Sequence, residues 1–280
     1  MIFDLHTHSH HSDGLLSPAQ LAALAAERRV DLIALTDHDT IAGCGEMRAA
    51  CASHNLKYVA GVELSCSWRG QTLHVLGLAI DCGHGPLHGH LEGLLQLRRE
   101  RMRLIAERLT RRCGAEFGLL AVEVARTVPV PTRMHLAREL VRAGHCEHTG
   151  FAFKDYLTRG RPGYAPSDWP DLQTTLQVIA AAGGQAALAH PHRYKLSSGA
   201  LRSLVAEFAQ SGGRALECSS GPTSPNDVAR LASLAAAHGL SVSAGSDFHD
   251  PANPWNTPGR FAKLPAGADL LASYLDKAHG

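Results

Sequence analysis

Two pairs of potential metal ligands stand near opposite ends of this chain. Residues 4–8 read D-L-H-T-H, and residues 246–249 read S-D-F-H. Each segment places two ligand-type side chains, His6 with His8 and Asp247 with His249, two residues apart after a short apolar run. In a β-strand, residues with this spacing point to the same side. Imidazole binds Zn, Mn, Fe, Ni or Cu, and carboxylate adds affinity for harder cations, so the two segments predict a hydrolytic metal site.

Further acidic and imidazole side chains occur in or after the other predicted strands. In a closed parallel barrel the carboxyl ends of the strands meet on one face, where active sites are assembled. Burying so many ionisable groups together without a metal ion would be very unfavourable. The candidate ligands are His6, His8, Asp13, His38, Glu63, His74, His190, Asp247 and His249. The set is too large for one ion and fits two or three. Asp37 and Asp39 flank His38 and are expected to orient ligands.

Alternating strand and helix patterns are expected to position these groups. Strands are predicted at 2–5, 31–35, 58–63, 71–80, 185–189, 215–218 and 241–244, and helices at 18–29, 41–53, 172–182, 201–210, 226–238 and 268–277. Ser17 is a suitable N-cap for the first helix, with Pro18 at its first position. A hairpin is expected to turn at Arg69-Gly70. The alternation itself predicts parallel βα units, an α/β fold.

Residues 91–164 interrupt this alternation. Helical patterns occur at 91–112, 133–143 and 151–158, without a strand-like run of any length. We expect most arginines of residues 98–112 to form a solvated face. The predicted organisation is a barrel domain made of residues 1–90 and 165–280, with a small all-helical insertion at 91–164. The insertion is expected to cap the mouth of the barrel and to recognise the substrate.

Composition narrows the functional classes. The chain has 280 residues, 18 of them histidine, and a formal net charge of +1, so no global field indicates a nucleic-acid or membrane partner. Hydrophobic residues make up 45% of it, enough for a substantial core. Seven cysteines without framework spacing suggest a reducing compartment. Neither a signal peptide nor a membrane span is indicated, so we expect a cytoplasmic protein with no obligate protein partner.

The ordered motifs resemble a known family. D-L-H-T-H-S, T-D-H-D, G-V-E, H-V-L-G, A-H-P and G-S-D-F-H, in that order, are similar to the PHP (polymerase and histidinol phosphatase) superfamily. The resemblance implies a distorted (β/α)7 TIM-like barrel with a trinuclear centre that uses Mn, Fe or Zn, of which Mn is the expected ion. It also implies a division of ligands between the ions. His6, His8, Glu63 and Asp247 would hold one ion; Glu63, His74 and His190 a second; Asp13, His38 and His249 the third.

The insertion resembles one bacterial branch of that superfamily. T-R-M-H-L-A-R at 132–138, D-Y-L at 155–157 and G-R-P-G-Y at 160–164 are similar to segments of 3′,5′-nucleoside bisphosphate phosphatases. Some members of that branch also act as 5′→3′ exoribonucleases (RNase AM). The resemblance implies a nucleotide substrate, such as 3′,5′-adenosine bisphosphate, and also short 5′-phosphorylated single-stranded RNA.

The expected chemistry is in-line attack on phosphorus by a metal-bridging hydroxide held at the Glu63 site. His192 is the candidate that protonates the leaving 3′-oxygen. The guanidinium fork of arginine suits a second, non-reacting phosphate, and Arg133 with His135 is the preferred clamp. Lys154, Arg161 and Arg193 are further substrate-binding candidates, each weighed against an ordinary surface cation.

Three alternatives stay open. A histidinol-phosphate phosphatase would share the metal site but has no need for arginines in the insertion. A polymerase-associated nuclease module is disfavoured because the 280 residues contain no polymerase segment. A barrel that binds metal without catalysis is the alternative of another class. Degeneration would first damage the ligand set, which here carries a competent side chain at every position.

Overall fold

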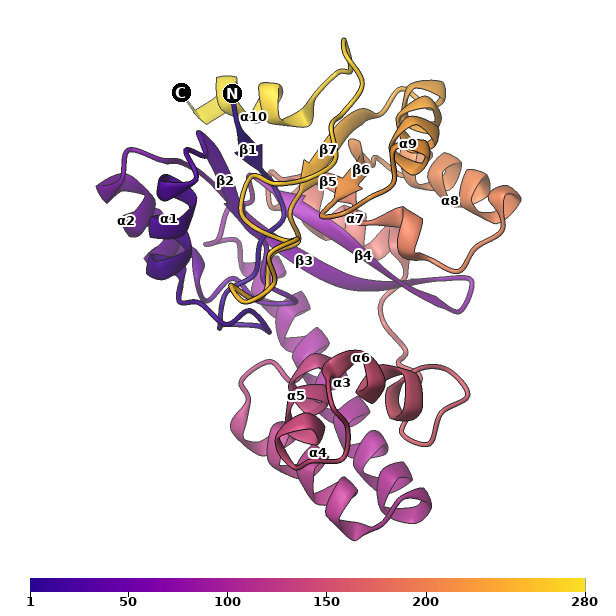
Figure 1. Cartoon of the computed structure of the whole chain (residues 1–280). Coiled ribbons are helices and arrows are strands. Elements are labelled where there is room, and N and C mark those ends of the chain that lie inside the picture. Colours follow the sequence, from indigo (N-terminus) through magenta and orange to yellow (C-terminus); the bar gives the residue numbers. More distant parts are fainter. Residues whose placement is uncertain (280) are drawn as a thin grey trace. The chain divides into compact units, whose positions relative to one another are not determined.

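Seven strands form one sheet in chain order in this computed structural model, which describes residues 1–279 (Figure 1). They are β1 (Phe3–Asp4), β2 (Leu32–Leu35), β3 (Lys57–Trp68), β4 (Gln71–Leu78), β5 (Gln185–Leu188), β6 (Ala215–Ser220) and β7 (Ser241–Gly245). The two edges approach each other, since the Leu5 N–H donates to the Ala244 carbonyl at 3.2 Å and Thr7 bridges Phe248 in parallel. The sheet is therefore a nearly closed barrel, and the predicted fold class is confirmed.

Strand β4 gives the barrel its distortion. Strands β1 to β3 and β5 to β7 pair in parallel, whereas β4 runs antiparallel to both β3 and β5. The hairpin between β3 and β4 turns at Arg69 and Gly70, whose φ angles are 46° and 74°. Two consecutive positive φ values match the right-handed twist of a two-residue hairpin. The predicted turn is confirmed, and β3 continues five residues past its predicted end, to Trp68.

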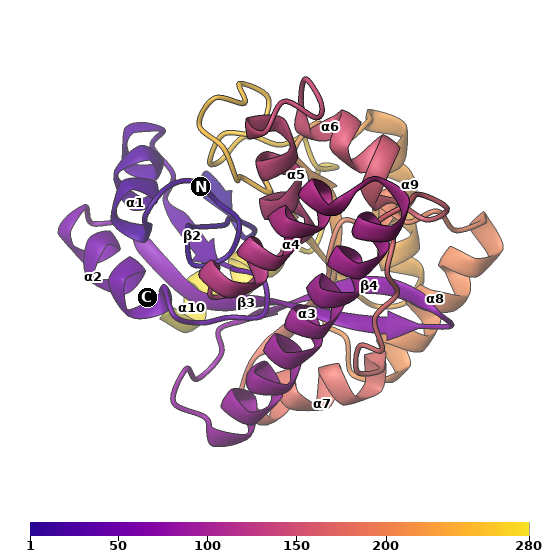
Figure 2. The same ribbon diagram turned by 90° about the horizontal axis from the view of Figure 1, so that it is seen from below.

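Helices cover the outside of the barrel. They are α1 (Pro18–Glu27), α2 (Cys44–Ser53), α7 (Leu172–Ala181), α8 (Ser198–Gln210) and α9 (Pro225–Ala237), with a short 3₁₀ turn η2 (Pro191–Arg193). Helix α10 (Leu271–His279) instead packs Leu271, Ala272 and Leu275 against the apolar cluster inside the barrel. Ser17 caps α1 as expected: its Oγ accepts the Gln20 N–H at 3.1 Å, and the Gln20 side chain accepts the Ser17 N–H. Figure 2 shows α1 and α2 side by side next to β2.

Apolar side chains fill the inside of the barrel. Leu5, Val59 and Leu76 are fully buried there, next to several strand alanines. A second cluster packs α1 and α2 onto the outer face of β2, where Ile33 contributes. The rigid packing of both faces holds the strand ends, from which the polar side chains emerge.

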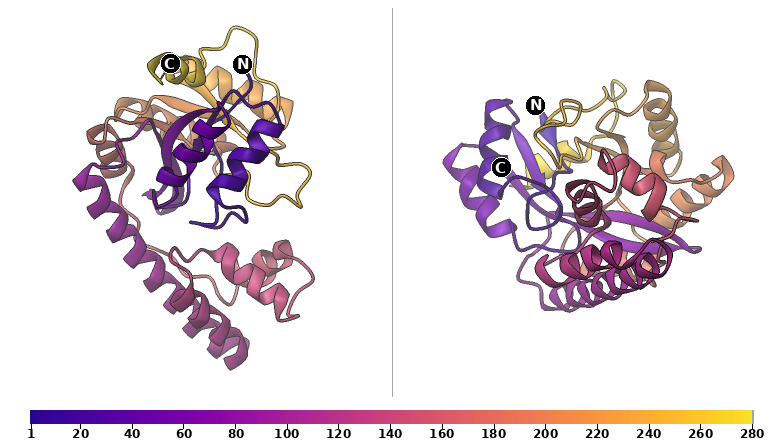
Figure 3. Two further views of the ribbon diagram at one scale, coloured as in Figure 1. Left: turned by 90° about the vertical axis from the view of Figure 1, so that its left-hand side faces the viewer. Right: turned by 60° about the horizontal axis from the view of Figure 1, so that its bottom comes forward.

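Residues 91–169 form a compact unit of their own, here called the helical unit; residues 1–90 with 170–280 form the barrel unit. The chain enters the helical unit within α3 (Gly85–Arg112) and continues through α4 (Ala115–Thr127), α5 (Arg133–Arg142), α6 (Thr149–Ala152) and the π-helical turn η1 (Phe153–Leu157) (Figure 3). Its own core joins residues of α3, α4 and α5, among them Ile105, Ala121 and Leu140. Helix α4 was not predicted, because the exposed Leu119 and Val122 obscure its apolar periodicity.

No helix within residues 1–279 is long and apolar enough to cross a membrane. All seven cysteines are free thiols. Both observations agree with the composition of the chain.

Candidate metal centre

The strand-end pair His6 and His8 lies at the carboxyl end of β1. Both side chains are fully buried, while Thr7 between them points the other way and donates its hydroxyl to the Ala34 carbonyl at 2.6 Å. This is the alternation expected of extended backbone. The following loop is held by Asp37, whose carboxylate accepts hydrogen bonds from the backbone and hydroxyl of Ser9 and from the hydroxyl of Ser12. A buried carboxylate thus fixes the loop that carries His8.

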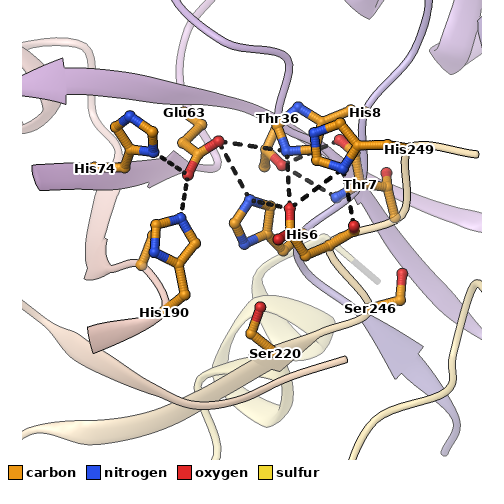
Figure 4. Close-up of polar contacts among 12 residues, drawn as sticks. His6, Thr7, His8, Thr36, Glu63, His74, His190, Ser220, Ser246 and His249 are labelled. Carbon is orange, nitrogen blue, oxygen red and sulfur yellow. Dashed lines mark hydrogen bonds and ion pairs between the residues drawn. The ribbon is translucent and has the colours of Figure 1, made fainter. Parts of the chain in front are cut away.

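Glu63 is the hub of the centre. Its side chain is buried in β3, and Figure 4 shows its carboxylate between the rings of His74 and His190 on one side and those of His6 and His8 on the other. Five imidazoles have a ring nitrogen between 2.8 and 3.4 Å from its oxygens: His6, His8, His38, His74 and His190. His74 reaches the hub from the middle of β4, because the antiparallel register places it opposite Ser65. Like Glu63, it therefore lies within a strand, whereas His6, His8 and His190 follow the carboxyl ends of theirs.

Asp247, Asp13 and His249 complete the cluster from the other side. Oδ1 of Asp247 lies 3.4 Å from Nε2 of His6 and 3.3 Å from Nε2 of His8. Nε2 of His249 lies 3.2 Å from Oδ1 of Asp13, and the His249 ring stacks on that of His8 with centroids 4.0 Å apart. The structure thus brings all nine predicted ligands into one connected cluster.

The cluster divides into four groups whose ligand atoms lie within 4.8 Å of one another. They are His8, Asp13, His38 and His249; His6, Glu63 and His190; His6, His8 and Asp247; and His38, Glu63 and His74. His38 belongs to two of them, since its Nδ1 lies 2.8 Å from Glu63 while its Nε2 lies 3.8 Å from Asp13. The family-derived division placed His38 with Asp13 and His249 alone. In the structure it also connects that group to the hub.

The cluster fits cations in its donor chemistry. Nε2 of His6, Nε2 of His8 and Oε2 of Glu63 are buried and form no hydrogen bond with residues 1–279. Their lone pairs face one another at 3.3–3.4 Å, an arrangement that a metal ion would satisfy. Burial opposes protonation of His6, but the charges of Glu217, Glu63 and Asp247 outweigh it and raise the pKa of His6 well above its ordinary value. A metal ion would take the place of that proton.

Two of the predicted ligands have strained backbone. His190 has φ 32° and ψ 51°, and Asp247 has φ 52°, both in the left-handed region that side chains with a Cβ disfavour. Such strain persists where surrounding contacts over-determine it, and it concentrates at functional sites. The Asp247 N–H donates to the His6 carbonyl at 2.9 Å, so the strained residue is tied directly to β1.

Arg193 and His192 follow His190 in η2 of the barrel unit. Arg193 donates from Nη1 to Asp247 and from Nη2 to the Ser220 hydroxyl at 3.0 Å. It therefore lies at the cluster, as a substrate-binding role requires. His192 is half-buried; burial first, and the Arg193 charge next, lower its pKa. No contact ties His192 to a ligand side chain within residues 1–279.

The helical unit contains a buried set of arginines. Arg98 is 7% exposed and Arg101 is half-buried; their guanidinium carbons lie 5.6 and 5.9 Å from the centre of the Trp169 ring. Arg133 lies over the Phe153 ring at 5.6 Å. Burial, followed by the charges of Arg133 and Arg98, lowers the pKa of Arg101 to about 9. Three cations so close together repel one another, and a multiply charged anion would relieve that repulsion.

Most arginines of residues 98–112 are exposed, as expected, but Arg98 is buried and Arg101 is half-buried. Arg98 donates from Nη1 to the Pro131 carbonyl at 3.5 Å, and Nε of Arg101 donates to the Ala165 carbonyl at 3.1 Å. Arg103 behaves as expected: it is exposed and pairs with Glu100 and Glu107 along the helix. The density of charged residues along α3 does not distinguish Arg98 and Arg101 from the exposed arginines, because burial depends on what packs against the helix.

The remaining substrate-binding candidates differ in setting. His135 completes a capping box on α5, where its Nδ1 accepts the Thr132 N–H at 3.1 Å. A neutral His135 therefore carries its proton on Nε2, which can donate to an anion. Lys154 is exposed and lies 5.7 Å from the Phe151 ring centre. Arg161 is exposed, and no contact joins either cation to Arg98, Arg101 or Arg133 within residues 1–279.

Sequence reasoning did not single out the buried carboxylate of Glu217 in the barrel unit. Glu217 in β6 is fully buried and accepts a hydrogen bond from Nδ1 of His6 at 2.9 Å. A signal was present, because Glu217 is the one charged residue in the apolar run that forms β6. It was passed over because β6 contributed no residue to the predicted ligand set.

Known proteins resemble this chain in sequence and in fold. The family model of the PHP domain matches residues 4–111. A 5′-3′ exoribonuclease Rnm of Salmonella typhimurium is 42% identical over 96% of this chain and 92% of its own length. A 3′,5′-nucleoside bisphosphate phosphatase of Chromobacterium violaceum is 37% identical over 94% and 92%. The structure of an amidohydrolase from Chromobacterium violaceum, with bound sulfate and no metal, superposes with a TM-score of 0.92 at 35% identity, covering 99% of this chain and 96% of that one.

Proposed function

This chain belongs to the PHP-domain family, and on that premise we propose that it is a metal-dependent phosphoesterase acting on nucleoside 3′,5′-bisphosphates. It would remove the 3′-phosphate, converting 3′,5′-adenosine bisphosphate to AMP and phosphate, and would also degrade short 5′-phosphorylated RNA from its 5′ end. The observation that carries the proposal is the presence of two separate sets of charged side chains. The buried histidine and carboxylate cluster suits a reacting phosphoryl group, and the clustered arginines of the helical unit suit a second phosphate.

The nine clustered side chains would hold two or three divalent ions, with Mn preferred and Fe or Zn also suited to imidazole and carboxylate. Ions bound there would supply an activated water and neutralise charge on the phosphoryl oxygens. Glu63 would orient the ligands around it, because imidazoles from β1, β4 and the ends of β2 and β5 converge on its two oxygens.

Residues next to the cluster would handle the phosphate and the leaving group. Arg193 would bind an oxygen of the reacting phosphate, since its guanidinium already lies against the Asp247 carboxylate. His192, two residues after the ligand His190, would donate a proton to the leaving 3′-oxygen.

The arginines of the helical unit would bind the phosphate that is not hydrolysed. Arg133 and Arg101 are each held by a hydrogen bond to a backbone carbonyl, of Leu157 and Ala165 respectively. This anchoring leaves less rotamer entropy to lose on binding, and a guanidinium matches two phosphate oxygens at once. Nε2 of His135 would add a neutral donor. Lys154 and Arg161 would act only as exposed cations that attract longer substrates.

The decisive experiment compares substrates on metal-reconstituted protein. Hydrolysis of 3′,5′-adenosine bisphosphate, adenosine 3′-monophosphate, histidinol phosphate and a 5′-phosphorylated RNA oligomer would be measured side by side. The bisphosphate and the RNA should be preferred over the substrates with a single phosphate. Preference for histidinol phosphate would reject the assignment, and no hydrolysis of any substrate would favour the non-catalytic alternative.

A matched pair of variants tests the arginine set. Arg133→Met should raise the KM for the bisphosphate by about 10- to 100-fold, from about 1.5–3 kcal/mol per charged hydrogen bond, with little effect on a 3′-monophosphate. Arg142→Met is the control on the same helix, because Arg142 is exposed and pairs with Glu139. Equal effects of Arg133→Met on both substrates would contradict the proposed binding of the second phosphate by Arg133.

A further inference from the structure

We propose that Glu217 is a positioning residue that selects the metal-binding tautomer of His6 and holds the strained backbone of His190. The inference rests on the proposed function only in that the cluster binds metal. It concerns a residue outside the predicted ligand set, and each oxygen of its carboxylate contacts a different ligand residue.

The sheet geometry brings Glu217 between two ligand-bearing segments. It lies in β6, which pairs with β5 on one side and with β7 on the other. The β6–β7 ladder shifts register between Glu217 and Ser219. An extra residue of this kind bends a strand and re-aims its side chains, and such irregularities recur beside active sites. The Glu217 side chain consequently reaches His6 after β1 and His190 after β5, with no exposed surface of its own.

The first contact determines the tautomer of His6. Oε1 of Glu217 lies 2.9 Å from Nδ1 of His6, and an ionised carboxylate can only accept a hydrogen bond. The proton of the neutral imidazole must then be on Nδ1. Nε2 keeps its lone pair and points at Glu63 and Asp247, both at 3.4 Å, where a metal ion would bind.

The second contact holds the backbone of His190. The His190 N–H donates to Oε2 of Glu217 at 2.5 Å. His190 is in the left-handed region and precedes Pro191, a combination that needs support from its surroundings. This conformation directs Nε2 of His190 to Oε1 of Glu63 at 2.9 Å. One carboxylate therefore orients two ligands from two strands.

Both groups that contact Glu217 donate hydrogen bonds to it, so replacing its carboxylate with the amide of glutamine tests the proposal directly. A glutamine of the same shape offers one acceptor and one donor group, so it can satisfy His6 or His190 but not both. If the amide donates to His6, the imidazole must move its proton to Nε2 and loses its lone pair toward the metal. If it accepts from His6 instead, its NH₂ group faces the His190 N–H.

Metal affinity is the measured quantity, without substrate. Glu217→Gln should weaken binding of Mn²⁺ to the purified protein by roughly 10- to 100-fold in calorimetric titration, the usual effect of losing such an outer carboxylate. Glu207→Gln is the control: Oε2 of Glu207 accepts from the indole N–H of Trp68 at 2.8 Å and from Nη2 of Arg69 at 3.5 Å, and an amide oxygen can still accept both bonds. Equal affinities of the two variants would overturn the proposal.

A second measurement does not depend on folding of the variant. In ¹⁵N-histidine spectra of the Zn-loaded wild-type protein, His6 should carry its proton on Nδ1 and show a metal-shifted Nε2. A proton on Nε2 of His6 would overturn the proposal. A protein that binds metal and shows the Glu217 effect but hydrolyses no bisphosphate would reject the proposed function and leave this inference standing.

Discussion

The guanidinium of Arg193 donates from Nη1 to Oδ2 of Asp247, whose Oδ1 lies 3.4 Å from Nε2 of His6. A cation suited to phosphate is thus paired with a carboxylate of the predicted metal cluster. Burial opposes the charged form of Arg193, but the carboxylate of Asp247 outweighs it and raises the pKa of the guanidinium. The ion pair with Asp247 thus fixes the positively charged guanidinium of Arg193 at the cluster.

Replacing Arg193 tests whether it binds the reacting phosphate. Arg193→Met should lower kcat/KM by about 10- to 100-fold for the bisphosphate and for a 3′-monophosphate alike, because both carry that phosphate. Steady-state kinetics on the two substrates provide the measurement, with Arg202→Met on the exposed side of α8 as control. A loss confined to the bisphosphate would assign Arg193 to the second phosphate instead.

Anion binding to the helical unit should be visible as thermal stabilisation. In metal-free protein, pyrophosphate should raise the Tm, since a ligand at 100 times its Kd contributes about 2.7 kcal/mol. Arg101→Met should reduce this shift, because it removes one of three clustered cations. Arg103→Met, which removes an exposed cation of the same helix, should leave it unchanged. Equal shifts in both variants would place the anion elsewhere.

Chelation of metal should abolish hydrolysis and lower the Tm. The cluster gathers imidazoles and carboxylates in a buried space, so loss of the ions leaves lone pairs facing one another. At 100-fold excess over Kd a single ion contributes about 2.7 kcal/mol, or roughly 5–11 °C for a chain of this size. Differential scanning calorimetry with EDTA and with Mn²⁺ measures the change. A Tm independent of EDTA would contradict metal binding by the folded state.

Cysteine reactivity should follow the local electrostatics. Cys82, Cys113 and Cys146 are all half-buried. A hydrogen bond from Cys44, opposed by burial and helped by Arg48, lowers the pKa of Cys82 to about 7, whereas burial raises the pKa of Cys113 and of Cys146. The Cys82 thiolate should therefore predominate above about pH 7.

Iodoacetamide labelling followed by peptide mass spectrometry measures that difference. Cys82 should be alkylated first at pH 7.5, with a rate that rises between about pH 6 and pH 8, because only the thiolate reacts. Because the pKa of Cys82 falls from 9.0 to about 7, this group contributes stability that is fully present above about pH 9 and is lost as the pH falls to about 7. Faster labelling of Cys113 would contradict the assignment.

The sequence predicted the barrel and the clustering of the candidate ligands, for a local reason. Alternation along a strand is a property of the backbone, so the spacing of His6 and His8 was sufficient to place both on one side. The Arg69-Gly70 turn is also local, because residues that tolerate positive φ mark it. Helix α4 shows the limit, since its exposed apolar residues break the pattern on which such reasoning depends.

By itself, then, the sequence determined which side chains are candidate metal ligands and which segments present them. Only the tertiary structure decided how those side chains meet. The antiparallel course of β4 brings His74 to Glu63, and the packing of α3 buries Arg98 and half-buries Arg101 while leaving Arg103 in solvent. The register shift in β6 accompanies the contacts of Glu217 with His6 and His190. Each of these depends on contacts between residues far apart in the chain, which no local spacing encodes.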